Sequence, residues 1–431
     1  MSQYLKNAPL YSAQVTEQVQ QTVAEMLGRI EREGVDAIRH YSRELDGWDP
    51  DSFLVDRDTA LAAGEQLDDE LREHIAFAQE QVRGFAQAQR ATLQDLEVET
   101  LPGVTLGHRH IPVQTVGSYV PGGRYPMLAS SFMTVIVPKV AGVDRVVACA
   151  PPQRDKGIHP AMSYAMATSG ADAILALGGV QAMAALALGI EGLPPADIIV
   201  GAGNAYVAEA KRRLFGEVGI DLLAGPTEIA IIADATADPV IVAADLLGQA
   251  EHGPTSPCVL FTTSEELGKA VIEAVGELLL TWPTAAVAGA AWEAHGSVVL
   301  ADDLDEAIAL SDAMAPEHLE VQVAEDRLDH CLDTLRNYGS LFLGEQATVA
   351  YGDKGVGTNH VLPTMGAAKY TGGLWVGKFL KTCTYQRLTD EGTRRIAPTI
   401  AAISSAEHLE GHALTATMRL DRLPQPASST L

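Results

Sequence analysis

The sequence predicts an α/β fold built on parallel sheets, and three observations point to this class. Short apolar runs, such as AILAL at 173–177 and IIV at 198–200, alternate with segments of helical spacing. This alternation is typical of β-α-β units, in which helices cover a parallel sheet. It starts again with IAIIA at 229–233, and a chain of 431 residues is too long for one ordinary core. We therefore expect two or three domains.

The elements predicted before residue 120 are two helices and a strand-rich stretch. Apolar residues recur at helical spacing between Val19 and Ile30, and Gly34 follows as a helix stop. A second amphipathic helix is predicted over 71–82. Residues 103–120 then have the character of strands.

From residue 127 onwards, helices and strands alternate. The first half of this region predicts helices over 127–141, 162–169 and 181–188 and strands over 145–150, 173–177 and 198–200. The second half predicts a strand at 229–233, helices near 239–250 and 265–279, and strands near 257–263 and 297–300. The tail after about residue 375 is predicted to be helical, with a strand over 413–420 and a polar end.

The composition excludes several classes of partner and site. Asp and Glu number 56 against 30 Lys and Arg, a formal net charge of −26, so we expect neither nucleic acid nor an anionic membrane as a partner. No apolar run reaches the roughly 18 residues of a membrane span and no secretory signal is evident, so a cytoplasmic location is expected. The cysteines show no C-x-x-C spacing and are expected to be small buried hydrophobes; they are Cys149, Cys258, Cys331 and Cys383.

The stretch QAEHGP at 249–254 carries the most chemistry. If it is helical, Gln249 and His252 share one face. Three later groups could close a site around them, namely Glu317-His318, Asp353 and His412. Imidazoles, a carboxylate and an amide oxygen suit Zn²⁺ or a similar divalent ion. Each of these residues, taken alone, is equally well explained as an ordinary surface or core residue.

A dinucleotide site has only weaker signals. No G-x-G-x-x-G fingerprint and no P-loop occur at the expected places. Glycines do follow predicted strands in YVPGG at 119–123, GGVQ at 178–181 and GAGN at 201–204. Such turns let the backbone approach a pyrophosphate and aim a helix N-terminus at it. The GAGN stretch falls at the carboxyl end of a strand, where ligands of open α/β sheets bind. The alternative is that these glycines only make tight connections.

Together these stretches resemble the histidinol dehydrogenase family. The resemblance covers nearly the whole chain in order, and its matching stretches are YVPGG at 119–123, LGGVQAMAALALG at 177–189, GAGNAYVAEAKRRLFG at 201–216, AGPTE at 224–228, QAEHGP at 249–254, APEHLE at 315–320, GTNHVLPT at 357–364 and EHLEGH at 407–412. It implies an enzyme that uses NAD and Zn²⁺ to oxidise a primary alcohol, through an aldehyde, to a carboxylate. It also implies an intertwined homodimer with shared active sites.

The same resemblance implies a domain plan. Two incomplete Rossmann-like domains without the glycine fingerprint are expected, with small N- and C-terminal helical and strand segments. Residues 1–20 would form an arm, and residues 375–431 would form a dimerisation segment. Residues 21–118 would join 229–374 in a discontinuous domain that carries the metal and the catalytic residues. Residues 119–228 would form the domain that faces NAD.

Roles for single residues also follow from the resemblance. Zn²⁺ would be held by Gln249, His252, Asp353 and His412, and the dinucleotide would be faced by Tyr119, Gln181 and Asn204. Glu317 and His318 would be the catalytic acid/base pair. We expect His318 to be the base for hydride removal, because a neutral imidazole suits that task at pH 7, and Glu317 to be the base for aldehyde hydration. Substrate contacts would come from the ligand residues Gln249, His252 and His412 and from Thr227, His318, His360 and Glu407.

The sequence departs from the histidinol enzymes in its basic residues. Arg124 follows YVPGG, where those enzymes carry neutral residues, and Lys378 stands where the family tends to be acidic. Histidinol is a cation, which basic residues would repel, whereas Arg124 with Lys369 or Lys378 would suit a sulfonate or phosphate. The alternative is that all three are surface charges.

The stretches GGRYPM at 122–127 and YTGGLWVGKFLKT at 370–382 resemble the sulfopropanediol 3-dehydrogenases, a branch of the family. This implies oxidation of (R)-2,3-dihydroxypropane-1-sulfonate to sulfolactate, with Zn²⁺ on the vicinal oxygens. Oxidation of L-histidinol to L-histidine is the alternative, and Glu407 fits it, because that position pairs with the substrate amine in histidinol enzymes. A catalytically silent metal- or nucleotide-binding protein is a third possibility.

Overall fold

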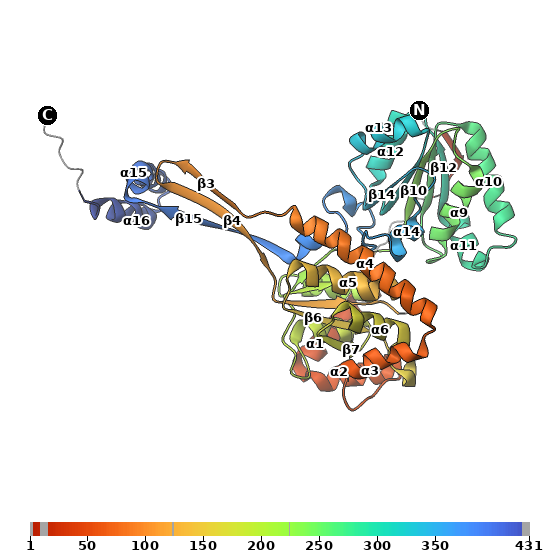
Figure 1. The fold of residues 1–431 in the computed structure, drawn as a ribbon, viewed down its shortest axis with the longest axis horizontal. Helices are drawn as coiled ribbons and strands as arrows, with labels where there is room; N and C mark the ends of the chain where they lie inside the picture. Colours follow the sequence, from red (N-terminus) through yellow and green to blue (C-terminus); the bar gives the residue numbers. More distant parts are fainter. Residues whose placement is uncertain (1–2, 9–15, 123–124, 224, 425–431) are drawn as a thin grey trace. The chain divides into compact units, whose positions relative to one another are not determined.

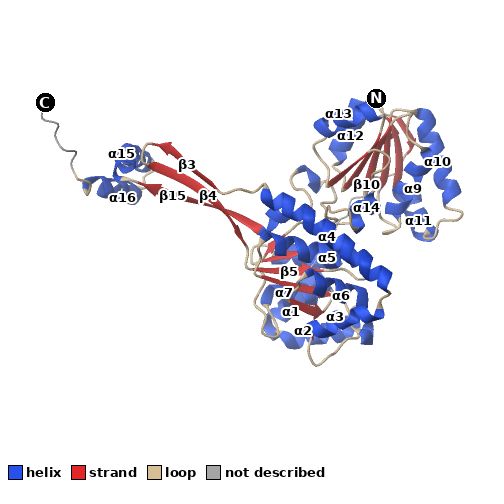
Figure 2. Cartoon of the chain, viewed as in Figure 1, coloured by secondary structure: helices blue, strands red, loops and turns tan. Residues whose placement is uncertain are grey.

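The computed structural model describes residues 3–8, 16–122, 125–223 and 225–424, and it separates into two compact units. Unit 1 comprises Met1–Arg90 and Val113–Phe379, and unit 2 comprises Ala91–Pro112 and Leu380–Leu431. Figure 1 shows the path of the chain and Figure 2 its helices and strands. No helix of the described part is long and apolar enough to cross a membrane.

The first sheet of unit 1 has six strands in the order β2-β7-β6-β5-β8-β9. Its strands are β2 (Leu54–Val55), β5 (Thr115–Tyr119), β6 (Arg145–Ala150), β7 (Ala173–Ala176), β8 (Ile198–Val200) and β9 (Gly219–Ile220). All neighbours run parallel except β2, which pairs antiparallel with β7. The chain order reverses at β5, between β6 and β8, and such a switch point is where open α/β sheets bind ligands.

Helices on both sides of this sheet close its core. The helices of this region are α1 (Glu17–Glu33), α2 (Val35–Tyr41), α3 (Arg57–Ala62), α4 (Asp69–Ala91), α5 (Leu128–Ala141), α6 (Pro160–Ser169), α7 (Gly179–Leu188) and α8 (Ala205–Leu214). Val23, Met26 and Ile30 of α1 are buried in one cluster with Leu175 of β7 and Val207 of α8. Helix α1 is thus part of this core, as the spacing of its apolar residues predicts.

The expected domain boundaries need correction here. The resemblance places residues 21–118 in one domain with 229–374, but α1, α2, β2 and β5 belong to the sheet and core of 119–228. The physical reason is that the buried face of α1 packs on α7 and α8. The expected arm of 1–20 contains β1 (Gln3–Lys6), which pairs with β12 of the other sheet.

The second sheet of unit 1 has six strands in the order β1-β12-β11-β10-β13-β14. Its remaining strands are β10 (Ile229–Ala233), β11 (Cys258–Thr262), β12 (Gly296–Leu300), β13 (His318–Gln322) and β14 (Ser340–Leu343). Its helices are α9 (Pro239–Ala250), α10 (Glu265–Leu278), α11 (Ala285–His295), α12 (Leu304–Met314), α13 (Leu328–Thr334) and α14 (Val349–Lys354). Ile229 and Ile231 face the α9–α10 side, and Ala230 and Ile232 face the α12 side. Both faces of the sheet are therefore covered. The strands β10 to β14 run parallel, and only the edge strand β1 runs antiparallel, to β12.

Unit 2 is a three-stranded antiparallel sheet in the order β15-β4-β3, followed by two helices. Its elements are β3 (Leu96–Leu101), β4 (Val104–Pro112), β15 (Leu380–Leu388), α15 (Asp390–Ala406) and α16 (Glu410–Asp421). Two predictions for this region are wrong. Residues 380–388 form a strand because they pair along the whole of β4, and 413–420 are helical because Ala413 and Ala416 share the buried face of α16. Cys383 of β15 is exposed, while Cys149, Cys258 and Cys331 are buried as expected.

Candidate active site and dinucleotide cavity

The expected acid/base pair, Glu317 and His318, lies at the amino end of a strand. His318 is the first residue of β13, with Glu317 just before it, and Thr227 and Glu228 immediately precede the neighbouring strand β10. Ligands of open parallel sheets usually bind at the carboxyl ends of the strands. The second sheet therefore presents the opposite edge to the site.

Helix α9 returns to this amino edge and brings Gln249 with it. The helix ends at Ala250, so the condition under which Gln249 and His252 would share one helical face is not met. The chain turns instead, and the backbone N–H of His252 donates to the backbone oxygen of Gln249 at 3.3 Å. Gly253 and Pro254 follow, which favours termination. His252 is half-buried and lines the cavities around the site.

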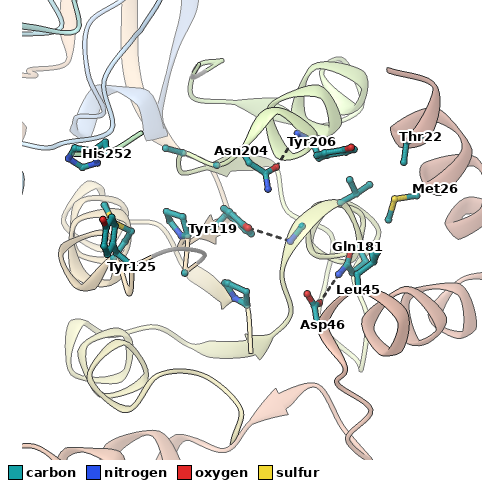
Figure 3. Close-up of a pocket in the computed structure, with 18 of the residues that line it drawn as sticks. Thr22, Met26, Leu45, Asp46, Tyr119, Tyr125, Gln181, Asn204, Tyr206 and His252 are labelled. Atoms are coloured by element: carbon teal, nitrogen blue, oxygen red, sulfur yellow. Dashed lines mark hydrogen bonds between the residues drawn. The ribbon is translucent and has the colours of Figure 1, made fainter. Parts of the chain in front are cut away.

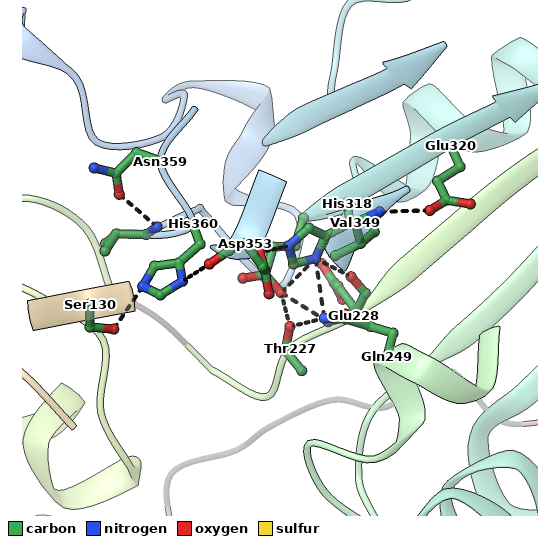
Figure 4. Close-up of polar contacts among 12 residues, drawn as sticks. Ser130, Thr227, Glu228, Gln249, His318, Glu320, Val349, Asp353, Asn359 and His360 are labelled. Carbon is green, nitrogen blue, oxygen red and sulfur yellow. Dashed lines mark hydrogen bonds and ion pairs between the residues drawn. The ribbon is translucent and has the colours of Figure 1, made fainter. Parts of the chain in front are cut away.

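A chain of hydrogen bonds connects α9 to the carboxylate of Glu317 (Figure 4). The Nε2 of Gln249 donates to Oγ1 of Thr227 at 2.5 Å, and this hydroxyl donates to Oε2 of Glu317 at 2.5 Å. The N–H of Glu228 donates to the same Oε2 at 3.0 Å. The carboxylate is thus fixed by two donors, and the amide oxygen of Gln249 remains for another partner.

His318 is buried, and its contacts define its protonation. Its Nδ1 lies 3.1 Å from the backbone oxygen of Glu228, which can only accept, and 3.3 Å from Nε2 of Gln249, which can only donate. The shorter contact, together with the pKa of about 9, favours a proton on Nδ1. The Nε2 lies 3.4 Å from Oδ1 of Asp353 and has no hydrogen-bond partner within the described residues. Nε2 is therefore the atom of this ring that can take up or release a proton in the site.

The buried charges shift one another. Burial lowers the pKa of His318, but the charges of Glu317 and Asp353 outweigh it and raise the pKa to about 9. Burial raises the pKa of Glu317 to about 7, against the opposing charge of His318. Burial and the charge of Glu317 raise the pKa of Glu228 to about 7 as well. In the chain without ligands, His318 is the protonated member of the pair at pH 7.

Asp353 and His360 extend the cluster toward α5. Asp353 is buried at the end of α14, and although burial opposes it, the contact with His318 holds its pKa well below the usual range. Nδ1 of His360 lies 3.1 Å from the backbone oxygen of Asp353, and its Nε2 lies 2.7 Å from the hydroxyl of Ser130 (Figure 4). With Nδ1 as the donor, Nε2 accepts from Ser130. Ser130 thus joins α5 to the catalytic side of the molecule.

The expected metal ligands of unit 1 present suitable donor atoms. Gln249 offers its amide oxygen, because its nitrogen is the atom that donates to Thr227. Asp353 is ionised, and burial lowers the pKa of His252, so that its imidazole is neutral. Neutral imidazole and ionised carboxylate are the forms that bind zinc, so these residues fit the ion. Among the described residues, no three His, Cys, Asp or Glu side chains gather closely enough to hold a metal by themselves. The expected set also includes the amide of Gln249 and His412 of unit 2.

The predicted dinucleotide residues line one cavity of about 780 Å³ at the switch point of the first sheet. Tyr119 ends β5, and its hydroxyl accepts from the N–H of Gly179 at 3.3 Å. Gln181 is buried in α7, and Asn204 caps α8 by accepting from the N–H of Tyr206 at 3.0 Å. Figure 3 shows Tyr119 and Asn204 in the middle of the cavity and His252 at one end. Thr227 and His252 also line it, so the cavity reaches the catalytic cluster.

The GAGN loop is held by a buried ion pair that the sequence did not reveal. Gly201 has φ +116°, and a Cβ there would lie 2.0 Å from the oxygen of Tyr119, so only glycine fits. The Nζ of Lys211 donates to the oxygen of Gly201 at 2.9 Å and pairs with Asp221. Asp221 in turn accepts from the N–H of Gly201 at 2.7 Å. Only tertiary packing brings Lys211 and Asp221 together.

The remaining predicted substrate residues are less closely grouped. Arg124 lies outside the described residues. Lys369 is exposed in a short 3₁₀ turn, and Nζ of Lys378 donates to Oγ1 of Thr371 at 2.8 Å. Glu407 ends α15 and His412 lies on α16, both exposed on unit 2.

Comparisons with known proteins agree on one family. The model of the histidinol dehydrogenase family matches residues 11–420. A histidinol dehydrogenase homolog from Shouchella clausii is 53% identical, covering 98% of this chain and 99% of its own. A sulfopropanediol 3-dehydrogenase from Ruegeria pomeroyi is 49% identical, covering 97% and 96%. The crystal structure of histidinol dehydrogenase from Elizabethkingia anophelis superposes with a TM-score of 0.91 at 33% identity, covering 96% and 94%. The chain therefore belongs to the histidinol dehydrogenase family.

Proposed function

We propose that this chain is a zinc-dependent dehydrogenase that uses NAD⁺ twice to oxidise a primary alcohol, through its aldehyde, to a carboxylate. The observation that carries the proposal is the continuity of two sites. Thr227 and His252 line the cavity of about 780 Å³ that Tyr119, Gln181 and Asn204 also line. Thr227 is also hydrogen-bonded to Glu317. A nicotinamide at this end of the cavity would lie next to an acid/base pair.

Each catalytic residue then has a definite task. A zinc ion on Asp353 would offset part of the negative charge that raises the pKa of His318 to about 9, so that the ring could be neutral at pH 7. Nε2 of the neutral ring would then take the proton of the substrate hydroxyl, while Nδ1 faces the backbone oxygen of Glu228. Glu317 serves the hydration of the aldehyde, since a carboxyl with a pKa of about 7 is half ionised at neutral pH. A zinc ion held by Gln249, His252, Asp353 and His412 would lower the pKa of a bound hydroxyl or water.

We propose a small anionic diol as the substrate, with (R)-2,3-dihydroxypropane-1-sulfonate, giving sulfolactate, as the best candidate. The 49% identity to a sulfopropanediol 3-dehydrogenase supports this choice. A second support is Lys354, which follows Asp353 and lines a cavity of about 210 Å³ with His252 and Tyr125. This cavity has the size of a small organic molecule. Glu251 also lines it, but its Oε2 accepts from the hydroxyl of Thr284 at 2.9 Å.

L-Histidinol is the second candidate, with L-histidine as product. The close superposition on a histidinol dehydrogenase structure favours it, and so does Glu407, a carboxylate suited to an amine. An assay of NADH formation with each alcohol separates the two. Turnover of the sulfonate with two NADH per molecule supports the first candidate. Turnover of histidinol alone would replace it with the second.

The zinc requirement has its own test. EDTA treatment should abolish activity and lower the Tm, and Asp353→Asn should reduce the zinc content per chain. Glu251→Gln is the matched control, because it changes a carboxylate next to His252 that is not among the proposed ligands. Unchanged activity and Tm after complete chelation would remove zinc from the proposal.

We also propose a homodimer with shared active sites. Unit 2 exposes many large apolar side chains, and exposed apolar patches mark interaction surfaces; the set is Leu96, Val98, Leu101, Leu106, Ile111, Leu388, Ile400, Ile403, Leu409, Leu414 and Met418. A second copy of the chain would cover them and contribute Glu407 and His412. Light scattering of the purified protein tests the assembly.

A further inference from the structure

The dinucleotide cavity has a second end, far from the catalytic cluster, at which Asp46 lies. Asp46 ends the short π-helical turn Ser42–Asp46 and is partly buried. Figure 3 shows Asp46, Gln181, Leu45 and Met26 at this end and His252 at the other. If the nicotinamide is next to His252, as the proposed function requires, the adenosine half of the dinucleotide extends toward Asp46.

Asp46 and Gln181 present two acceptors side by side. The Nε2 of Gln181 donates to Oδ2 of Asp46 at 2.8 Å. This contact uses the amide donor, so Oε1 of Gln181 is left as an acceptor, and it is buried with no partner within the described residues. A buried acceptor without a donor is costly. The site therefore calls for a ligand that brings hydroxyl or N–H donors.

The charge of this cavity discriminates among such ligands. Of the described residues that line it, Asp46 is the only carboxylate, and none is Lys or Arg. Burial raises the pKa of Asp46, with the Gln181 amide opposing, which is consistent with a carboxylate short of donors. A phosphate group placed here would meet a negative charge and no cation.

We propose that Asp46 and Gln181 accept hydrogen bonds from the 2′- and 3′-hydroxyls of the adenosine ribose, and that Asp46 thereby selects NAD⁺ over NADP⁺. The vicinal diol of NAD⁺ supplies one donor for each acceptor. In NADP⁺ the 2′-hydroxyl is replaced by a phosphate dianion, which removes a donor and places like charges together. The inference rests on the proposed orientation of the dinucleotide in the proposed function.

Binding of ADP-ribose and of its 2′-phosphate, measured by calorimetry without substrate, tests the inference at the adenosine end alone. The wild-type protein should bind ADP-ribose more tightly. Asp46→Asn keeps the size of the side chain and removes its charge. It should weaken ADP-ribose binding about tenfold, the loss expected for one charged hydrogen bond. The ratio between the Kd of the 2′-phosphate and the Kd of ADP-ribose should fall at least about tenfold. NAD⁺ and NADP⁺ should show the same trend.

Glu44→Gln is the matched control, because it removes the same charge from the same turn at an exposed carboxylate that does not line the cavity. Its binding constants should equal those of the wild type, and thermal melts verify that both variants fold. An unchanged preference in Asp46→Asn, or a wild-type protein that binds both ligands equally or neither, overturns the inference. A wild-type protein that prefers ADP-ribose but oxidises no alcohol would leave the inference standing and refute the proposed function.

Discussion

Nε2 of His318 lies 3.4 Å from Oδ1 of Asp353, and both side chains are buried. Asp353 and Glu317 together raise the pKa of His318 to about 9, above the value of about 6.5 in an unfolded chain. The folded chain therefore binds a proton at this ring more tightly than the unfolded chain does. This stabilisation, on the order of 3 kcal/mol, is fully present below pH ~6.5 and is lost as the pH rises through about 9.

We therefore expect the apparent Tm of EDTA-treated protein to fall between pH 7 and 9. Glu228 and Glu317 also disfavour folding as they ionise, but with pKa values of about 7 they act mainly below this window. His318→Asn should flatten the profile above pH 7. His330→Asn is the control, since His330 is an exposed histidine that contacts Asp305 at 2.8 Å. Equal slopes for the wild type and His318→Asn would show that His318 is not the titrating group.

The adjacent pair makes a second prediction, about the two oxidation steps. His318→Ala should slow the first hydride transfer by about 10²- to 10⁴-fold, which is the usual contribution of a general base to the rate. Glu317→Ala should still form the first NADH but oxidise the aldehyde slowly. Rapid-mixing measurement of NADH, with alcohol and with separately supplied aldehyde, distinguishes the steps. Normal aldehyde oxidation by the Glu317 variant would contradict this division of roles.

A buried carboxyl pair supports the third prediction. Nε2 of Gln322 donates to Asp245 at 2.9 Å and to Glu320 at 3.1 Å. Burial raises the pKa of both carboxyls. Through their contact, Asp245 raises the pKa of Glu320 further, and Glu320 lowers the pKa of Asp245. Because the pKa of Glu320 is raised well above the usual value, by burial and by the charge of Asp245, we expect the pair to hold one proton.

This pair ties together the elements that carry the site. The N–H of Val349 donates to Glu320 at 3.0 Å, at the start of the helix that ends with Asp353 and Lys354. Asp245 is one helical turn before Gln249, and Glu320 is two residues after His318 on β13. A change at the pair should therefore be felt at the proposed metal ligands.

Glu320→Gln should behave nearly as the wild type, because the amide can accept from Val349 and donate to Asp245. Glu320→Ala should lower the Tm and the zinc content together, and Glu266→Gln, at an exposed carboxylate of α10, should change neither. The measurements are thermal melts and metal analysis. If Glu320→Gln were as damaging as Glu320→Ala, the pair would not share a proton.

The sequence predicted the sheets well and the connections between distant segments poorly. Apolar alternation located strands such as 229–233 within a residue, because each is buried on both faces. It could not show that α1 packs on α7, nor that the second sheet presents its amino ends to the site, since both depend on tertiary packing. The pair Asp46–Gln181 was missed for the same reason, as 135 residues separate its members.

Family motifs, by contrast, named residues that the structure brings together. Thr227, Gln249, Glu317 and His318 lie in one hydrogen-bonded cluster. Glu228 belongs to the AGPTE motif, which implied no role for it, yet its backbone oxygen lies 3.1 Å from Nδ1 of His318. The roles of Glu407 and His412 stay a prediction, because they lie on unit 2.

The fourth prediction concerns those two residues. If His412 acts in a site formed with a second copy of the chain, His412→Ala and Glu317→Ala homodimers should each be inactive for different reasons. Mixing them after mild dissociation gives heterodimers in which one of the two shared sites has both residues intact. Activity should therefore return in the mixture, to about one quarter of the wild-type level if subunits exchange at random.

The control is a mixture of His412→Ala with Asp353→Asn, which is expected to recover equally, because Asp353 is on the same unit as Glu317. A mixture of Glu317→Ala with Asp353→Asn should stay inactive, because both changes affect the contribution of unit 1. Recovery in that last mixture would mean that Glu317 and Asp353 reach one site from different chains. No recovery in the first two mixtures, although differently tagged chains co-purify as heterodimers, would mean that each site is built from a single chain.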